Sequence, residues 1–224
     1  MSQTTSTISN FTPSAAASDL ARMQFIVSNM MNGMRTAMAV QVMAVTNNGG
    51  VSPIGYVDVQ PAVSSKAGDG TVQPHGIIHN VPYMRIQGGT NAVIIDPQVG
   101  DIGIATVCDR DISTVKSSQA ISAPGSSRKY DMSDMVYLMT IIGKQTPTQY
   151  VQFNSSGITI TSPNKVIINA NEVDVNATTI NSVGTWNHTG TLTATGDVVA
   201  GGKSLINHVH SGVTSGSSNT GKPV

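Results

Sequence analysis

Residues 151–201 constrain the fold most, because they form a long β-type stretch that cannot build a core from one copy of itself. Its apolar residues are nearly all β-branched and alternate with Ser, Thr, Asn and Asp, as at Ile158 and Ile160 and at Val173 and Val175. This alternation indicates strands with one apolar face. A single chain would close only a thin sheet with open edges, which favour aggregation. Three chains wound about one axis would have no such edges.

We therefore predict an intertwined trimeric β-helix or prism over residues 147–200, which would form a shaft. A single-chain β-sandwich is the alternative for this stretch. A single-chain solenoid fits less well, because turn residues such as Asn171, Asn181 and Gly184 recur at irregular spacing.

The composition also favours an oligomer. Charged residues make up 11% of the chain and aromatic residues 4%, so few large side chains are available for a conventional core. The formal net charge is zero and no basic tract is present, which argues against a nucleic-acid partner. The single cysteine, Cys108, excludes an intrachain disulfide and a CxxC metal motif, and fits assembly in a reducing cytoplasm. We expect neither a signal peptide nor a transmembrane helix.

An amphipathic helix is predicted within residues 1–35, after a polar arm over Met1–Ala17. Ser18 can cap its N-terminus and Asp19 lies in its first turn. Apolar residues then recur at steps of three and four, at Leu20, Met23, Ile26, Val27, Met30, Met31 and Met34. This face either packs on its own domain or forms a trimeric helix bundle.

Residues 36–146 carry five or six short apolar runs separated by Gly- and Pro-containing turns. This pattern is typical of a small β-barrel or sandwich, and an OB-like β-barrel fits the number of strands. The expected strands are Thr36–Thr46, Ile54–Val63, Ile77–Ile86, Val93–Ile95, Ile102–Val107 and Val136–Ile142. Pro82 suggests an edge or a bulge. The long Ser-rich loop Asp109–Asp134 is expected to be mobile or to pack against a neighbour.

The candidate metal ligands are His208 and His210, which lie in the predicted apex, residues 201–224. Residues i and i+2 of a strand face the same side, so the two imidazoles should project together while Val209 faces away. Three chains on a threefold axis would supply six imidazoles, the number of ligands that an octahedral ion takes. Zinc prefers four ligands and copper a tetragonal field, so iron(II) is the first choice and nickel the second.

Other polar groups are weaker candidates. His75 and His79 have the spacing of a helical zinc site, but Pro74, Gly76 and the two isoleucines between them favour strand or loop. Asp109, Arg110 and Asp111 indicate a loop ion pair. His188 beside Trp186 is expected at the surface or packed on a sheet. The glycine clusters at Gly68–Gly70 and Gly88-Gly89 indicate turns. No nucleophile–base cluster stands out, so we expect no enzymatic activity and no catalytic residue.

Two stretches of the sequence resemble a known family. INHVHSGVTSGSSNTGKPV, at residues 206–224, resembles the apex of phage central spikes. VGDIGIA at residues 99–105, together with CDRDIS at 108–113, resembles the N-terminal barrel domain of baseplate spikes from contractile-tailed phages.

The resemblance implies a homotrimer on the tail axis of the virion. One end would dock on the baseplate hub protein, and six histidines from three tips, His208 and His210 of each chain, would bind one iron ion. Contraction of the sheath would drive the spike through the host outer membrane. The open alternatives are a receptor-binding tail fibre, or the puncturing tip of a phage-tail-like bacteriocin or secretion system.

Overall fold

The computed structural model describes residues 18–47, 50–67, 69–212, 214 and 216–217. The arm predicted over Met1–Ala17 lies outside these residues, as does most of the C-terminal tail. The chain divides into two compact units, Met1–Val166 and Ile167–Val224. The domain boundaries expected after residues 35, 146 and 200 stay predictions.

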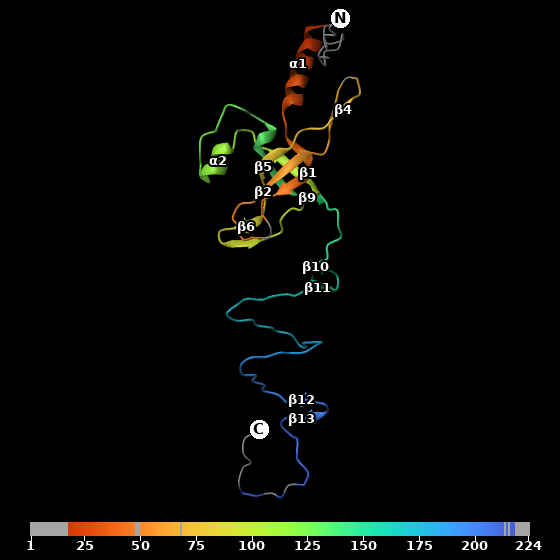
Figure 1. Cartoon of the computed structure of the whole chain (residues 1–224), viewed down its shortest axis with the longest axis vertical. Helices are drawn as coiled ribbons and strands as arrows, with labels where there is room; N and C mark the ends of the chain where they lie inside the picture. Colours follow the sequence, from red (N-terminus) through yellow and green to blue (C-terminus); the bar gives the residue numbers. More distant parts are fainter. Residues whose placement is uncertain (1–17, 48–49, 68, 213, 215, 218–224) are drawn as a thin grey trace. The chain divides into compact units, whose positions relative to one another are not determined.

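The predicted helix is present as α1, Asp19–Gly33 (Figure 1). The hydroxyl of Ser18 accepts a hydrogen bond from the backbone N–H of Ala21 at 3.1 Å, which caps the first turn. Its apolar residues remain exposed: Leu20 is 68% and Met30 69% accessible. Within the described residues, no helix is long and apolar enough to cross a membrane.

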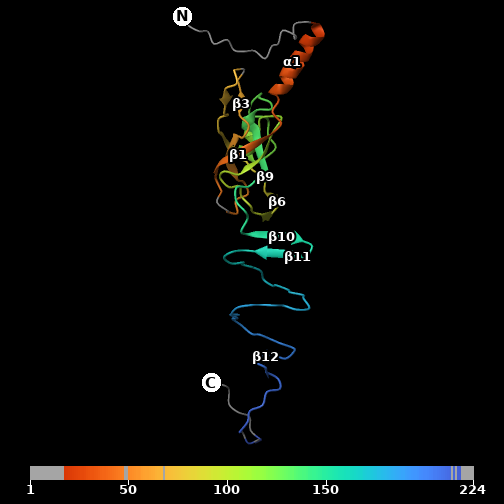
Figure 2. The ribbon, with the colours of Figure 1, turned by 90° about the vertical axis from the view of Figure 1, so that its right-hand side faces the viewer.

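Five of the six expected strands assemble into one antiparallel sheet, in the order β5-β2-β1-β8-β9, and Figure 2 labels β1 and β9 of this sheet. The sixth, expected at Val93–Ile95, overlaps the short strand β7 only at Val93 and lies outside the sheet. The strands are β1 Ala37–Val45, β2 Tyr56–Pro61, β5 Ile78–Pro82, β8 Ile102–Val107 and β9 Met135–Ile142. Alternate residues of β2 and β8 are buried, as the period of two requires. Two short hairpins accompany the sheet, β3 (Ser65–Lys66) with β4 (Val72–Gln73) and β6 (Ile86–Gly88) with β7 (Asn91–Val93).

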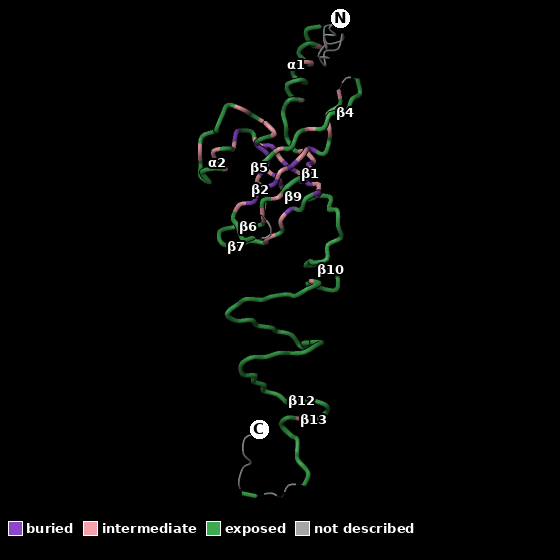
Figure 3. The backbone as a smooth tube through the Cα atoms, viewed as in Figure 1, coloured by how far each residue is buried: buried purple, intermediate pink, exposed green. Residues whose placement is uncertain are grey.

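The sheet buries a core made mostly of valine (Figure 3). Tyr137 and Met135 of β9 are its largest fully buried side chains. Its members are Val40, Val42, Val57, Val59, Val81, Tyr83, Ala105, Val107, Met135 and Tyr137. The unit that carries the sheet therefore has an interior of its own, which the low aromatic content did not indicate.

The prediction of a closed OB-like barrel is wrong in one respect, because the sheet does not close. The edge strands meet only at a bridge between Tyr83 and Tyr137, where the N–H of Met84 donates to the carbonyl of Tyr137 at 2.8 Å. Tyr83 donates in the opposite direction, to Gly55, so the backbone of Pro82 faces β9. Proline has no N–H, and the ladder between β5 and β9 cannot extend past it.

The loop Asp109–Asp134 is held by its own unit, contrary to the expectation of a mobile or neighbour-packed loop. It contains the short helix α2, Ser113–Ser118, and the 3-10 turn η2, Met132–Asp134. Arg128 donates to Asp134 at 2.7 Å and to Asp111 at 2.8 Å, and both carboxylates are buried. Hydrogen bonds from the side chain and backbone of Ser113, and then from Ser126, lower the pKa of Asp111 to about 2. The loop is thus closed by charge-assisted hydrogen bonds.

The distal part of the chain is almost entirely exposed (Figure 3). A hairpin of β10 (Tyr150–Asn154) and β11 (Gly157–Thr161) begins it, and a short hairpin of β12 (Val199–Ala200) and β13 (Lys203–Ser204) follows near its end. Between β11 and β12 the described chain forms no ladder with itself. The predicted trimeric β-helix therefore stays a prediction, since only one chain is described.

Replacing Gly103 of β8 with alanine should destabilise the sheet. A Cβ at this position would collide with the ring of Tyr137 and the backbone carbonyl of Met139, neither of which can move freely. We expect a loss of about 1–3 kcal/mol or more in the free energy of unfolding, measured by thermal or urea unfolding. Gly76→Ala is the control, because a Cβ there meets open space. Equal stability of the two variants would contradict the close approach of Tyr137 and Met139 to Gly103.

Arg128→Met should loosen the loop Asp109–Asp134, because it leaves two buried carboxylates without their cation. We expect a loss of about 2–3 kcal/mol, somewhat below that of a fully buried pair, since 37% of the Arg128 side chain is accessible. Arg110→Met is the matched control: Arg110 lies 3.7 Å from Asp109 in an exposed pair, which contributes at most about 1 kcal/mol. Unfolding measurements that fail to separate the two variants would exclude this role for Arg128.

Candidate metal-binding tip

A tight hairpin leads into the predicted metal-binding residues. Val199 pairs with Ser204 and Ala200 with Lys203, so β12 and β13 are joined by Gly201-Gly202. Both glycines have positive φ, 56° and 76°, as a type I′ turn requires. The N–H of Leu205 donates to the carbonyl of Val198 at 2.8 Å and extends the hairpin by one bond.

The rings of His208 and His210 lie next to each other. Their centroids are 5.2 Å apart and the ring planes meet at 81°, an edge-to-face arrangement. Val209 between them is 92% accessible. The Nδ1 atom of His208 lies 3.0 Å from the carbonyl oxygen of Leu205. A carbonyl only accepts, so Nδ1 carries the hydrogen in this contact and Nε2 keeps the lone pair that a metal needs.

These two residues fit a metal ion only in part. The imidazoles are adjacent and exposed, and imidazole is a good ligand for several transition metals. Among the described residues of one chain, however, no group of three or more His, Cys, Asp or Glu could hold an ion. One chain thus provides two adjacent imidazoles at the tip, and the role of His208 and His210 as ligands stays a prediction.

The other sequence candidates lie apart from the tip. His79, on β5 rather than on a helix, makes a contact of 2.7 Å from Nδ1 to a carboxylate oxygen of Asp58. His75 accepts a hydrogen bond at its backbone carbonyl from Gln60. Asp111 pairs with Arg128 rather than with Arg110. Trp186 is 74% accessible in the single chain, and the expectation that His188 beside it lies at the surface or packs on a sheet stays a prediction.

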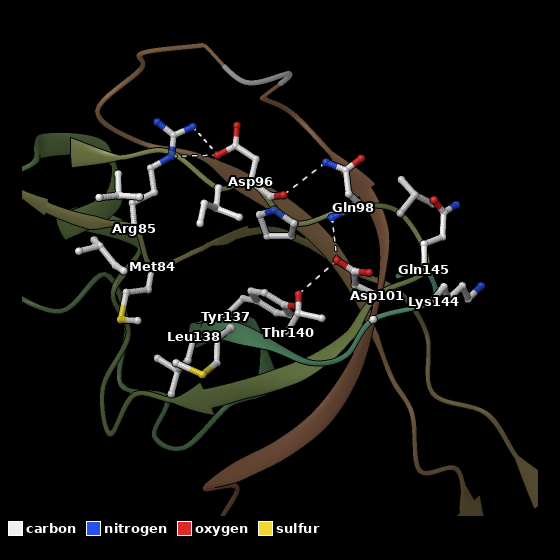
Figure 4. Close-up of a pocket in the computed structure, with 17 residues that line it drawn as sticks. Met84, Arg85, Asp96, Gln98, Asp101, Tyr137, Leu138, Thr140, Lys144 and Gln145 are labelled. Carbon is white, nitrogen blue, oxygen red and sulfur yellow. Dashed lines mark hydrogen bonds and ion pairs between the residues drawn. The ribbon is translucent and has the colours of Figure 1, made fainter. Parts of the chain in front are cut away.

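The sequence did not indicate the polar cluster beside a cavity of 720 Å³ at the β9 edge (Figure 4). Arg85 donates to one carboxylate oxygen of Asp96 at 2.6 Å and 3.0 Å, and Tyr83 donates to the same oxygen at 2.6 Å. Both side chains of the ion pair are almost fully buried. Burial, and then the hydrogen bond to Asp96, raise the pKa of Tyr83. These groups satisfy one another, so the cluster is a structural ion pair; the sequence separation of eleven residues provided no signal for it.

Comparison with known families finds two matches, one over the sheet and one at the C-terminal segment. The model of the phage protein Gp138 N-terminal domain matches residues 52–140, which contain most of the five-stranded sheet. The GpV Apex motif matches residues 204–224, which contain His208 and His210. No curated protein matches the chain. The match to the Gp138 N-terminal domain and the match to the GpV Apex motif on one chain together support a phage baseplate spike protein, located at the tail baseplate of the virion.

Proposed function

We propose that this protein is a homotrimeric, non-enzymatic spike whose metal-bound tip pierces the host outer membrane when the tail sheath contracts. The observation that carries the proposal is the apolar surface left uncovered in the distal half. Ile158, Ile160 and Val175 are each about two-thirds accessible in the single chain. A stiff point cannot be built from such a chain alone, whereas three copies would supply the missing cover.

The β10–β11 hairpin has a face that such cover would bury. Phe153 pairs with Ile158 and Val151 with Ile160, so one face of the hairpin is wholly apolar. The opposite face carries Gln152 and Thr159, which pair with each other. A face this apolar and this exposed marks an interaction surface. Contact between symmetry-related copies on a threefold axis would bury it in each chain.

Three tips would complete the metal site. One chain contributes two adjacent imidazoles, and three would contribute six, which suits an octahedral ion better than zinc or a tetragonal copper centre. The matched GpV Apex motif is associated with metal binding, which supports this step. We propose iron(II), with nickel as the second choice. The ion would lock three chain ends in register at a place where too few side chains remain for a core.

The work of penetration would come from the tail and not from chemistry in this chain. The end that carries the Gp138-type domain would dock on the baseplate hub, and the apex would point at the cell. The spike would therefore transmit force, and its requirements are stiffness, narrowness and resistance to unravelling.

The molar mass and metal content of the purified protein test the assembly. Three chains of 23.2 kDa predict a particle of about 70 kDa with one iron ion. The double variant His208→Ala/His210→Ala should lose the metal and keep the trimer, because the shaft surface is unchanged. Light scattering and elemental analysis measure both. A metal-free monomer, or stoichiometric iron in the double variant, would contradict the proposal.

Ile158→Asp tests whether the hairpin face lies between chains. In a monomer this side chain is 65% accessible, so a carboxylate there would have little effect. In a trimer it would place three charges in an apolar interior, and we expect dissociation or a large fall in the melting temperature. Thr159→Asp, on the opposite face, is the matched control and should remain trimeric. Identical behaviour of the two variants would rule out this face as the interface.

Virions that carry His208→Ala/His210→Ala distinguish a piercing spike from a receptor-binding fibre. A spike with a frayed tip should leave adsorption to host cells unchanged and lower the fraction of adsorbed particles that deliver DNA. Adsorption counts and potassium efflux from the host measure the two steps. Loss of adsorption itself would favour the fibre.

A further inference from the structure

The carboxylate of Asp197 organises the turn that carries His208. It lies just before β12, and its Oδ1 atom accepts a hydrogen bond from the N–H of Ile206, just after β13, at 3.1 Å. Hydrogen bonds from the Ser204 side chain, first, and then from the Ile206 backbone lower the pKa of Asp197. One carboxylate thus connects the two arms of the hairpin beyond its last strand pair.

Ser204 also fixes the backbone of the residues that follow it. Its Oγ atom accepts a hydrogen bond from the N–H of Asn207 at 2.8 Å. Residues 204–207 are therefore held as a turn from both sides, by the serine hydroxyl and by Asp197. The carbonyl of Leu205 lies inside this turn, and it is the group that accepts a hydrogen bond from Nδ1 of His208.

This chain of contacts has a chemical consequence for the imidazole. A carbonyl that accepts from Nδ1–H selects the tautomer in which Nε2 has its lone pair free, and it limits rotation of the ring. Both effects favour metal binding through Nε2. If the turn relaxes, the Leu205 carbonyl moves and the ring loses its fixed orientation.

We propose that Asp197 is a positioning residue for the tip metal: with Ser204 it holds the Leu205 carbonyl so that His208 presents Nε2 to the ion. The inference rests on the proposed function, since it assumes that His208 is a ligand. It assigns a role to a side chain outside the matched apex motif, seven residues before its start at Ser204. Asp197 itself does not touch the ion.

The experiment measures how fast the full-length protein releases iron. Purified trimer is loaded anaerobically with Fe(II), and loss to ferrozine, a chelator with a coloured iron complex, is followed with time. Asp197→Ala should release iron at least about tenfold faster than the wild type, as outer-shell partners of metal ligands typically do. Asp197→Asn keeps an acceptor for the Ile206 N–H and should lie closer to the wild type. Asp174→Ala, which removes an exposed carboxylate of the same unit, is the control.

A second readout separates positioning from general loosening. Cobalt(II) replaces iron, and the visible absorption bands of the bound ion report its ligand geometry. Asp197→Ala should shift these bands, Asp197→Asn should restore them, and Asp174→Ala should leave them unchanged. Light scattering checks that each variant is still a trimer. If Asp197→Ala does not form trimers, Ser204→Ala is used in its place. We expect Ser204→Ala to release iron faster than the wild type.

The outcomes separate this inference from the function on which it rests. Release from Asp197→Ala at the wild-type rate, unshifted cobalt bands, or no rescue by asparagine would each overturn the positioning role and leave the spike proposal intact. A wild-type protein that retains no iron, or a His208→Ala/His210→Ala variant that retains it, would overturn the proposed metal site itself.

Discussion

The structure depends on where apolar surface can be buried. The sheet unit solves this within one chain, because valines on alternate positions of β1 and β2 face Tyr137 and Met135 on β9. The distal half has the same alternation and nothing to bury it against, so Phe153 and Ile158 stay exposed. Removing apolar area from water is the main favourable term in folding. In the single chain, the sheet unit therefore buries its own core, while the distal half leaves its apolar side chains exposed.

Within the sheet unit, close packing compensates for the small number of large side chains. Gly103 and Gly55 leave room for the rings of Tyr137 and Tyr83, so two tyrosines fill an interior that has few other large side chains. The hydroxyl of Tyr83 is then satisfied by Asp96 and Arg85, which avoids the cost of an unpaired buried group. Arg128 does the same for Asp111 and Asp134. Low aromatic content therefore did not prevent a folded unit.

The tip is shaped by hydrogen bonds between residues close in the sequence rather than by a hydrophobic core. Gly201-Gly202, Asp197 and Ser204 shape a turn by backbone geometry and hydrogen bonds alone, with no apolar core. The turn brings His208 and His210 together without enclosing them. This is consistent with the proposed spike, where enclosure would come from symmetry and the ion, and where the single chain needs only to present its ligands correctly.

The sequence predicted that His208 and His210 lie next to each other, but it did so from a strand, and residues 208–210 lie outside any strand. Sequence alone determined the features that depend on short-range periodicity: the Ser18-capped helix and most strand positions. These follow from bond geometry over a few residues. Tertiary structure decided the rest: the open sheet edge at Pro82, the loop held by Arg128, and the link from Asp197 to the Leu205 carbonyl. Each of these joins groups six to fifty-four residues apart, and no local pattern encodes which distant donor meets which acceptor. That choice is made only when the chain packs and every buried polar group must find a partner.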